Sequence, residues 1–268
     1  MPFVPDGREV YRQAFERHEL IPAFNVCSIE MVRGCIEAAE ETKATIILQA
    51  YPTDLEQFPA EHFQKLVESM AWDSSATVLT HLDHGKSVEM VLECLRAGFS
   101  SVMFDGEALQ FEDTLEASQY LHRITSQMGA ALEVSAESFN QGFSVKTTPE
   151  RALQLKHAGA DTLAVSVGSE HGQASKLDLQ LLSEIQSRVN LPLVLHGGSG
   201  VSPDDLAAAR NLGVVKINIG SSLYRALRGV WDSHRDHPNH RNVYATAREA
   251  IRSVAKEKIQ VARLEKTR

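Results

Sequence analysis

Short apolar runs recur at fairly regular intervals along the chain, separated by longer segments with the periodicity of amphipathic helices. The runs are rich in Val, Ile, Leu and Thr, and nearly every position in them is apolar. This pattern is typical of strands that are buried on both faces, as parallel strands are. Eight such strands are predicted, at Ile21–Val26, Thr45–Gln49, Thr77–Leu82, Ser100–Phe104, Ala130–Ser135, Thr162–Val167, Leu191–Leu195 and Val214–Ile219.

The segments between these runs are predicted to be helices. In Ile29–Glu41, apolar side chains fall on one stripe and most charged side chains fall on the opposite one. Val88–Ala97 is followed by Gly98, which is typical of the position just after a helix. Ser202 followed by Pro203 predicts the start of another helix. Further helices are predicted at Phe111–Met128 and Glu150–Ala158.

Eight strands that alternate with helices over 268 residues favour an α/β fold of the (β/α)8 TIM barrel type. A doubly wound sheet is the alternative, but no GxGxxG motif follows the first strand. Since no low-complexity segment or long linker divides the chain, residues 1–268 are predicted to form a single barrel domain with a C-terminal helical extension. That extension, Val243–Ile259, is expected to cover the barrel or to pack against another subunit in a homodimer or homotetramer.

Composition and charge narrow the class of protein. A content of 43% hydrophobic and 23% charged residues excludes a disordered or collagen-like chain. The net charge of −8 argues against a nucleic-acid partner, although a local site could still bind an anionic small molecule. The three cysteines indicate a reducing compartment, and neither a signal peptide nor an apolar run long enough to span a bilayer is recognised. We therefore expect a cytoplasmic protein that binds no membrane.

Polar side chains follow several predicted strands, at the end of the barrel where active sites lie. His84, His171 and His196 follow three different strands, and a glycine comes directly after each of them. Three imidazoles with an open fourth position form a common catalytic zinc site. A single histidine of this kind is more simply a loop residue with local hydrogen bonds, but three at one mouth of a barrel favour a metal centre.

Two glycine-containing turns occupy the position where barrels of this kind bind phosphate. Gly197–Gly200 follows the seventh predicted strand and Gly220–Ser222 follows the eighth. Backbone N–H groups and the N-terminus of the next helix would hold the anion. The alternative is that both are tight turns in which glycine serves only the backbone conformation.

At these residues the sequence resembles the class II, zinc-dependent ketose-bisphosphate aldolases, which include fructose-1,6-bisphosphate and tagatose-1,6-bisphosphate aldolases. The matching segments are collinear and are Ala23–Val26, His81–Gly85, Ser101–Gly106, Leu163–Gly168, His171–Gly172, Leu193–Gly200 and Lys216–Ile219. The resemblance implies a lyase that reversibly cleaves a phosphorylated ketose to dihydroxyacetone phosphate and an aldehyde.

The resemblance also implies roles for individual residues. His84, His171 and His196 would hold Zn²⁺, and Asp83 would exchange a proton with the hydroxyl of the aldehyde half. The residues implied to bind dihydroxyacetone phosphate are Asn25, Gly172, Gly197, Ser199, Asn218 and Ser221. The aldehyde pocket is expected to come from the loops Tyr51–Pro59 and Ser138–Thr148.

The sequence departs from the family at three places. Ser135 replaces the second carboxylate of a Glu-x-Glu pattern on the fifth strand, whose first position is Glu133. The loop Ala136–Thr148 is short and keeps Glu137 as its one acidic residue, so the base that removes a proton from dihydroxyacetone phosphate is not located. The phosphate turn has Gly220–Ser221 where the family has Asp-Thr or Ala-Thr.

These departures leave alternatives open. Glu133 and Glu137 are candidates for a substitute base, and Glu170, next to His171, is a further one. Glu133 is equally a candidate for a carboxylate that orients a zinc-bound histidine. The protein could also be a catalytically impaired barrel that binds zinc or a sugar phosphate. A third hypothesis is a zinc enzyme that performs related enolate chemistry on another substrate.

Overall fold

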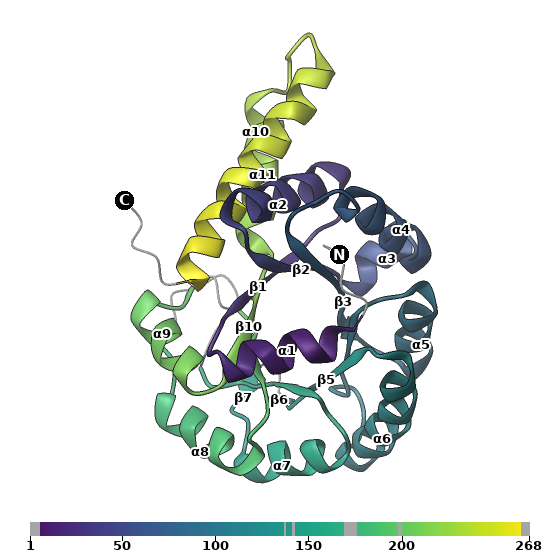
Figure 1. Ribbon diagram of the computed structural model, residues 1–268, viewed down its shortest axis with the longest axis vertical. Coiled ribbons are helices and arrows are strands. Elements are labelled where there is room, and N and C mark those ends of the chain that lie inside the picture. Colours follow the sequence, from purple (N-terminus) through teal and green to yellow (C-terminus); the bar gives the residue numbers. More distant parts are fainter. Residues whose placement is uncertain (1–5, 137, 141–142, 169–175, 198–199, 264–268) are drawn as a thin grey trace.

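The computed structural model describes residues 6–136, 138–140, 143–168, 176–197 and 200–263. Eight of its strands are β1 (Ile21–Asn25), β2 (Thr45–Ala50), β3 (Thr77–Gly85), β4 (Ser101–Phe104), β5 (Ala131–Ser135), β8 (Thr162–Ala164), β9 (Leu193–Leu195) and β10 (Val214–Ile219). They form a closed parallel barrel in the order β1-β10-β9-β8-β5-β4-β3-β2 (Figure 1). The TIM barrel is therefore confirmed, and the doubly wound alternative is excluded.

Helices surround this barrel and connect its strands. They are α2 (Ile29–Thr42), α3 (Pro52–Gln57), α4 (Ala60–Ala71), α5 (Val88–Ala97), α6 (Phe111–Met128), α7 (Pro149–His157), α8 (Leu179–Val189), α9 (Pro203–Asn211), α10 (Ser221–Ser233) and α11 (His240–Ala262). The predicted helix ends are confirmed at two places. Gly98 follows α5 with a left-handed φ of 100°, and the Ser202 hydroxyl accepts a hydrogen bond from the Asp205 N–H at the start of α9.

Two segments that were expected to be loops contain regular structure. The first, Tyr51–Pro59, includes the short helix α3. The second, Ser138–Thr148, includes two short strands, β6 (Ser138–Asn140) and β7 (Phe143–Val145), which pair in antiparallel fashion. Both were missed because segments this short show too little hydrophobic periodicity to be recognised.

A further helix, α1 (Gly7–Glu16), closes the N-terminal end of the barrel. Figure 1 shows it lying across the ring of strands. Tyr11 and Ala14 of α1 pack in a buried cluster with residues from the first half of several strands, among them Ile21, Leu79 and Ala131. The opposite end, where the strands finish, is the end at which barrel enzymes carry their active sites.

The helices α10 and α11 form an antiparallel pair that projects beyond the barrel (Figure 1). Its outer part has a small core of its own, made by Val230, Val243 and Ala247. The rest of α11 packs against α2 through buried residues that include Ile251. The predicted helix Val243–Ile259 is thus part of α11. The cysteines are free thiols, and no helix among the described residues is long and apolar enough to cross a membrane.

Candidate metal centre at the mouth of the barrel

Asp83 and His84 lie near the end of β3, where the strand is irregular. The register of β3 against β4 shifts between Leu82 and Gly85, and His84 has a left-handed φ of 56°. In a regular strand, successive side chains point to opposite faces, and an inserted residue cancels that alternation. The irregularity therefore lets two neighbouring polar side chains serve one site. A left-handed backbone costs a non-glycine residue about 1–3 kcal/mol and is concentrated at functional sites.

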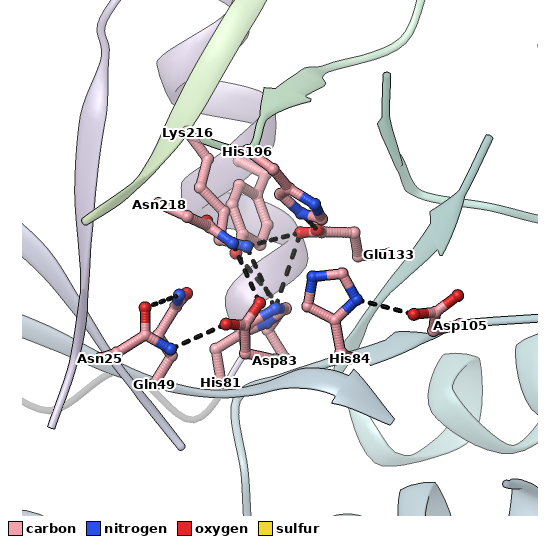
Figure 2. Close-up of polar contacts among 12 residues, drawn as sticks. Asn25, Gln49, His81, Asp83, His84, Asp105, Glu133, His196, Lys216 and Asn218 are labelled. Carbon is pink, nitrogen blue, oxygen red and sulfur yellow. Dashed lines mark hydrogen bonds and ion pairs between the residues drawn. The ribbon is translucent and has the colours of Figure 1, made fainter. Parts of the chain in front are cut away.

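Asp83, His84 and His196 form a group that could bind a metal ion. One possible ligand atom from each residue lies within 4.8 Å of the others. His196 comes directly after β9 and is only 1% exposed, and its ring centroid lies 4.7 Å from that of His84. Figure 2 shows Asp83 and His84, both from β3, near His196, which follows β9. His171, the third histidine predicted to bind the metal, lies outside the described residues.

Each of these two imidazoles has a carboxylate on one side. The Nδ1 of His84 is 2.7 Å from Oδ2 of Asp105, and the Nε2 of His196 is 3.5 Å from Oε1 of Glu133 (Figure 2). A carboxylate on one ring nitrogen fixes the orientation of the imidazole and leaves the other nitrogen to a metal. In His84 this pairing leaves Nε2 as the nitrogen that faces away from Asp105.

Asp83 is held by two amides from strands on the same side of the barrel. The Nδ2 groups of Asn25 and Asn218 donate to its two carboxylate oxygens at 2.7 and 2.9 Å, and Gln49 donates in turn to Asn25 at 2.9 Å. Burial raises the pKa of Asp83, but nearby positive groups, His84 first among them, bring that pKa below its ordinary value. Asp83 is therefore a carboxylate that two hydrogen bonds orient beside the two histidines.

The other predicted site residues are only partly described. Gly197 has a left-handed φ of 70°, and Ser221 begins α10 at the barrel mouth. Glu133 is fully buried and forms an ion pair with Lys216, with 2.9 Å between Oε2 and Nζ. Residues outside the described ranges are Glu137, Gly172 and Ser199.

Four described polar residues that contact this site had no role predicted from the sequence: Gln49, His81, Asp105 and Lys216. The sequence carries a signal for one of them, because Lys216 stands inside the apolar run Val214–Ile219. A lysine in a strand buried on both faces requires a partner, since an unpaired buried charge is very costly. The identity of that partner depends on how the barrel closes and could not be predicted.

Comparisons with known proteins agree with this geometry. The family model described as fructose-bisphosphate aldolase class-II matches residues 6–266. The chain is 33% identical over 269 residues to the uncharacterized protein YdjI of Escherichia coli K12, with 96% of each chain covered. It is 29% identical over 272 residues to a sulfofructosephosphate aldolase of Alkalicoccus urumqiensis, with 95% of each covered.

Two solved structures share the fold. The crystal structure of the YdjI aldolase from Escherichia coli K12 matches with a TM-score of 0.85 at 30% identity. The match covers 97% of this chain and 96% of the YdjI chain. A putative fructose-1,6-bisphosphate aldolase from Coccidioides immitis has a TM-score of 0.89 at 21% identity, with 98% and 97% covered. Because the family model matches nearly the whole length of the chain, the chain belongs to the class II fructose-bisphosphate aldolase family.

Proposed function

We propose that the protein is a zinc-dependent lyase that reversibly cleaves a phosphorylated ketose to dihydroxyacetone phosphate and an aldehyde. The observation that carries this proposal is the placement of the Asp83 carboxylate in one group with His84 and His196 at the mouth of the barrel. Such a group combines metal ligands with a proton acceptor, and aldol cleavage needs both. Membership of the class II aldolase family supports the same chemistry.

The described residues fit a zinc ion. Two imidazoles lie beside the Asp83 carboxylate, each with one possible ligand atom in the same group, and His171 is proposed as the third histidine ligand. The buried Oδ1 of Asn218 has no hydrogen-bond partner among the described residues, which leaves an acceptor for a bound substrate. When bound, zinc supplies a Lewis acid that stabilises negative charge on the ketone oxygen as the carbon–carbon bond breaks.

Asp83 is proposed to move the proton of the cleavage step. Its carboxylate takes the proton from the hydroxyl on the carbon that becomes the aldehyde. The electron pair of the broken carbon–carbon bond stays with the dihydroxyacetone phosphate half, which then gains a proton at that carbon. Glu133 and Glu137 remain candidates for the second proton transfer. The contacts of Glu133 with Lys216 and His196 favour an orienting role for that residue.

Two side chains beside the proposed metal centre suit the aldehyde half of the substrate. The Tyr51 ring centroid is 5.8 Å from that of His84, and the exposed Lys86 has its Nζ 5.9 Å from the Tyr51 ring. Dihydroxyacetone phosphate is proposed to bind at the glycine-containing turns that follow β9 and β10. The residues proposed to hold it are Asn25, Gly172, Gly197, Ser199, Asn218 and Ser221.

A substrate screen tests the proposal. The protein, with and without added zinc, is incubated with fructose 1,6-bisphosphate, tagatose 1,6-bisphosphate and the sulfofructose phosphate suggested by the name of one relative. Release of dihydroxyacetone phosphate from at least one ketose, dependent on zinc, is expected. Binding of zinc without cleavage of any ketose would favour the impaired barrel or a different substrate class.

We further propose that the protein assembles as a homodimer or homotetramer through the projecting pair of α10 and α11. The rings of Trp231 and Tyr244 pack edge to face on this pair of helices, with their centroids 5.3 Å apart. The two residues nevertheless remain 40% and 48% exposed. Two large aromatic side chains that pack together and stay this exposed, on helices that project beyond the barrel, are typical of surfaces that another protein chain covers.

Replacing Trp231 by glutamate is expected to reduce the mass of the assembly, because a charge would enter an interface core that excludes charged groups. Light scattering coupled to size-exclusion chromatography measures that mass. The matched control is Trp72→Glu, since Trp72 is 75% exposed at the end of α4 on the barrel and should leave the mass unchanged. An unchanged mass for the folded Trp231 variant would contradict the proposed interface.

A further inference from the structure

The interior of the barrel contains a buried ion pair below the proposed metal centre. Lys216 of β10 and Glu133 of β5 are both 0% exposed, and their Nζ and Oε2 atoms are 2.9 Å apart. The two strands are separated in the barrel by β9 and β8, so the pair crosses the interior. Removing two charges from water costs several kcal/mol per ion, and replacing such pairs with apolar residues is often neutral or stabilising. Stability alone therefore does not account for this pair.

The second oxygen of Glu133 points to the metal centre. Its Oε1 is 3.5 Å from Nε2 of His196, while Oε2 is the atom that Lys216 holds (Figure 2). One carboxylate thus lies between the buried lysine, from which it accepts a hydrogen bond, and the imidazole, which is at ion-pair distance. Carboxylates placed beside the ring of a metal-binding histidine set the orientation of that ring.

Lys216 is itself fixed from the other side by a chain of buried side chains. Its Nζ is 3.1 Å from Nε2 of His81, and His81 Nδ1 is 2.7 Å from Oγ of Ser101, which lies 3.3 Å from the hydroxyl of Tyr11. An ammonium group has donors only, so His81 Nε2 accepts and its Nδ1 carries the proton. This assignment requires a neutral His81, and burial, followed by the charge of Lys216, lowers the pKa of His81 to about 3.

The chain reaches from one end of the barrel to the other. Tyr11 belongs to α1, which closes the N-terminal end, and His196 lies at the C-terminal end. Tyr11, Ser101, His81 and Lys216 are each no more than 1% exposed. Water therefore has little access to these side chains, and each one is restrained by its neighbours in the chain.

We propose that Lys216 is a positioning residue for the metal centre: it holds Glu133 so that this carboxylate orients His196 toward the bound ion. The inference rests on the proposed metal site but not on the identity of the substrate. Carboxylates and other groups that orient metal-bound histidines typically change metal affinity by 10–100-fold when they are replaced.

Zinc affinity, measured by competition with a chelator, tests this role. Lys216→Met alone leaves the carboxylate of Glu133 buried without its partner and could prevent folding. The main variant is therefore the double replacement Glu133→Gln with Lys216→Met, which removes both charges and keeps similar side-chain volumes. We expect its zinc dissociation constant to rise by about 10–100-fold relative to the parent.

Two further measurements separate positioning from stability. The unfolding midpoint of the metal-free protein reports any structural damage in each variant. The matched control is Tyr11→Phe, which removes a buried hydroxyl from the far end of the same chain and should change the zinc dissociation constant by less than about threefold, even if it lowers the midpoint. A folded double variant with the zinc affinity of the parent would overturn the proposal.

Measurements on the parent protein distinguish a failure of the proposed lyase function from a failure of the proposed role of Lys216. A parent that binds zinc tightly but cleaves no ketose contradicts the proposed function and leaves the positioning test intact. A parent that binds no zinc contradicts the metal centre and, with it, the role of Lys216.

Discussion

Replacing His196 by alanine is expected to abolish both zinc binding and ketose cleavage. The change removes one of three proposed histidine ligands, and a site with two imidazoles no longer provides the usual ligand set of a catalytic zinc ion. It also deprives the buried Glu133 carboxylate of the imidazole that lies 3.5 Å away. The loss should thus exceed that from replacing any single residue that contacts substrate only.

Elemental analysis of the purified protein measures the zinc content, and a ketose-cleavage assay measures the activity. The matched control is His157→Ala, because His157 is exposed at the end of α7 on the outer layer of helices and should retain full zinc. Undiminished zinc in the His196 variant would contradict its assignment as a ligand.

Replacing Asp83 by alanine is expected to lower ketose cleavage while zinc stays bound. The expected decrease is about 10²–10⁴-fold, because that is the usual contribution of a positioned proton carrier. A carboxylate in this position can accept the proton of the substrate hydroxyl. Hydrogen bonds from Asn25 and Asn218 hold it in place. The turnover number and the zinc content are measured on the same preparation.

Asp73→Ala provides the control for this prediction, because Asp73 is an exposed carboxylate just after α4. Loss of zinc in step with activity would show instead that Asp83 acts as a metal ligand, a role that its place in the group with the two histidines allows. Unchanged turnover would remove Asp83 from the mechanism altogether.

The fold could be predicted from the sequence because parallel barrel strands are buried on both faces. Each strand therefore appears in the sequence as an apolar run. For β10 the predicted range, Val214–Ile219, is the same as the observed one. The helix α1 was not predicted, although Asp6 caps it by accepting from the Arg8 N–H. Its role in closing the barrel depends on contacts of Tyr11 with distant strands, which no local pattern reveals.

The candidate site was predictable only in part. His84 and His196 follow apolar runs, so their placement at one mouth of the barrel follows from the topology. The bulge that brings Asp83 into the same group depends on the register of β3 against β4, which the sequence does not disclose. The pairing of Lys216 with Glu133 likewise joins residues from strands that are not neighbours.

Exchange of deuterium from solvent into dihydroxyacetone phosphate tests the central claim most directly, because it reports proton removal without requiring the correct aldehyde. The zinc-loaded parent should catalyse this exchange, slowly because the loop after β5 is short, and a chelator or His196→Ala should suppress it. Comparison with Glu133→Gln, Glu137→Gln and Glu170→Gln would identify the base. Absence of exchange in a zinc-loaded parent that demonstrably binds dihydroxyacetone phosphate would contradict the account.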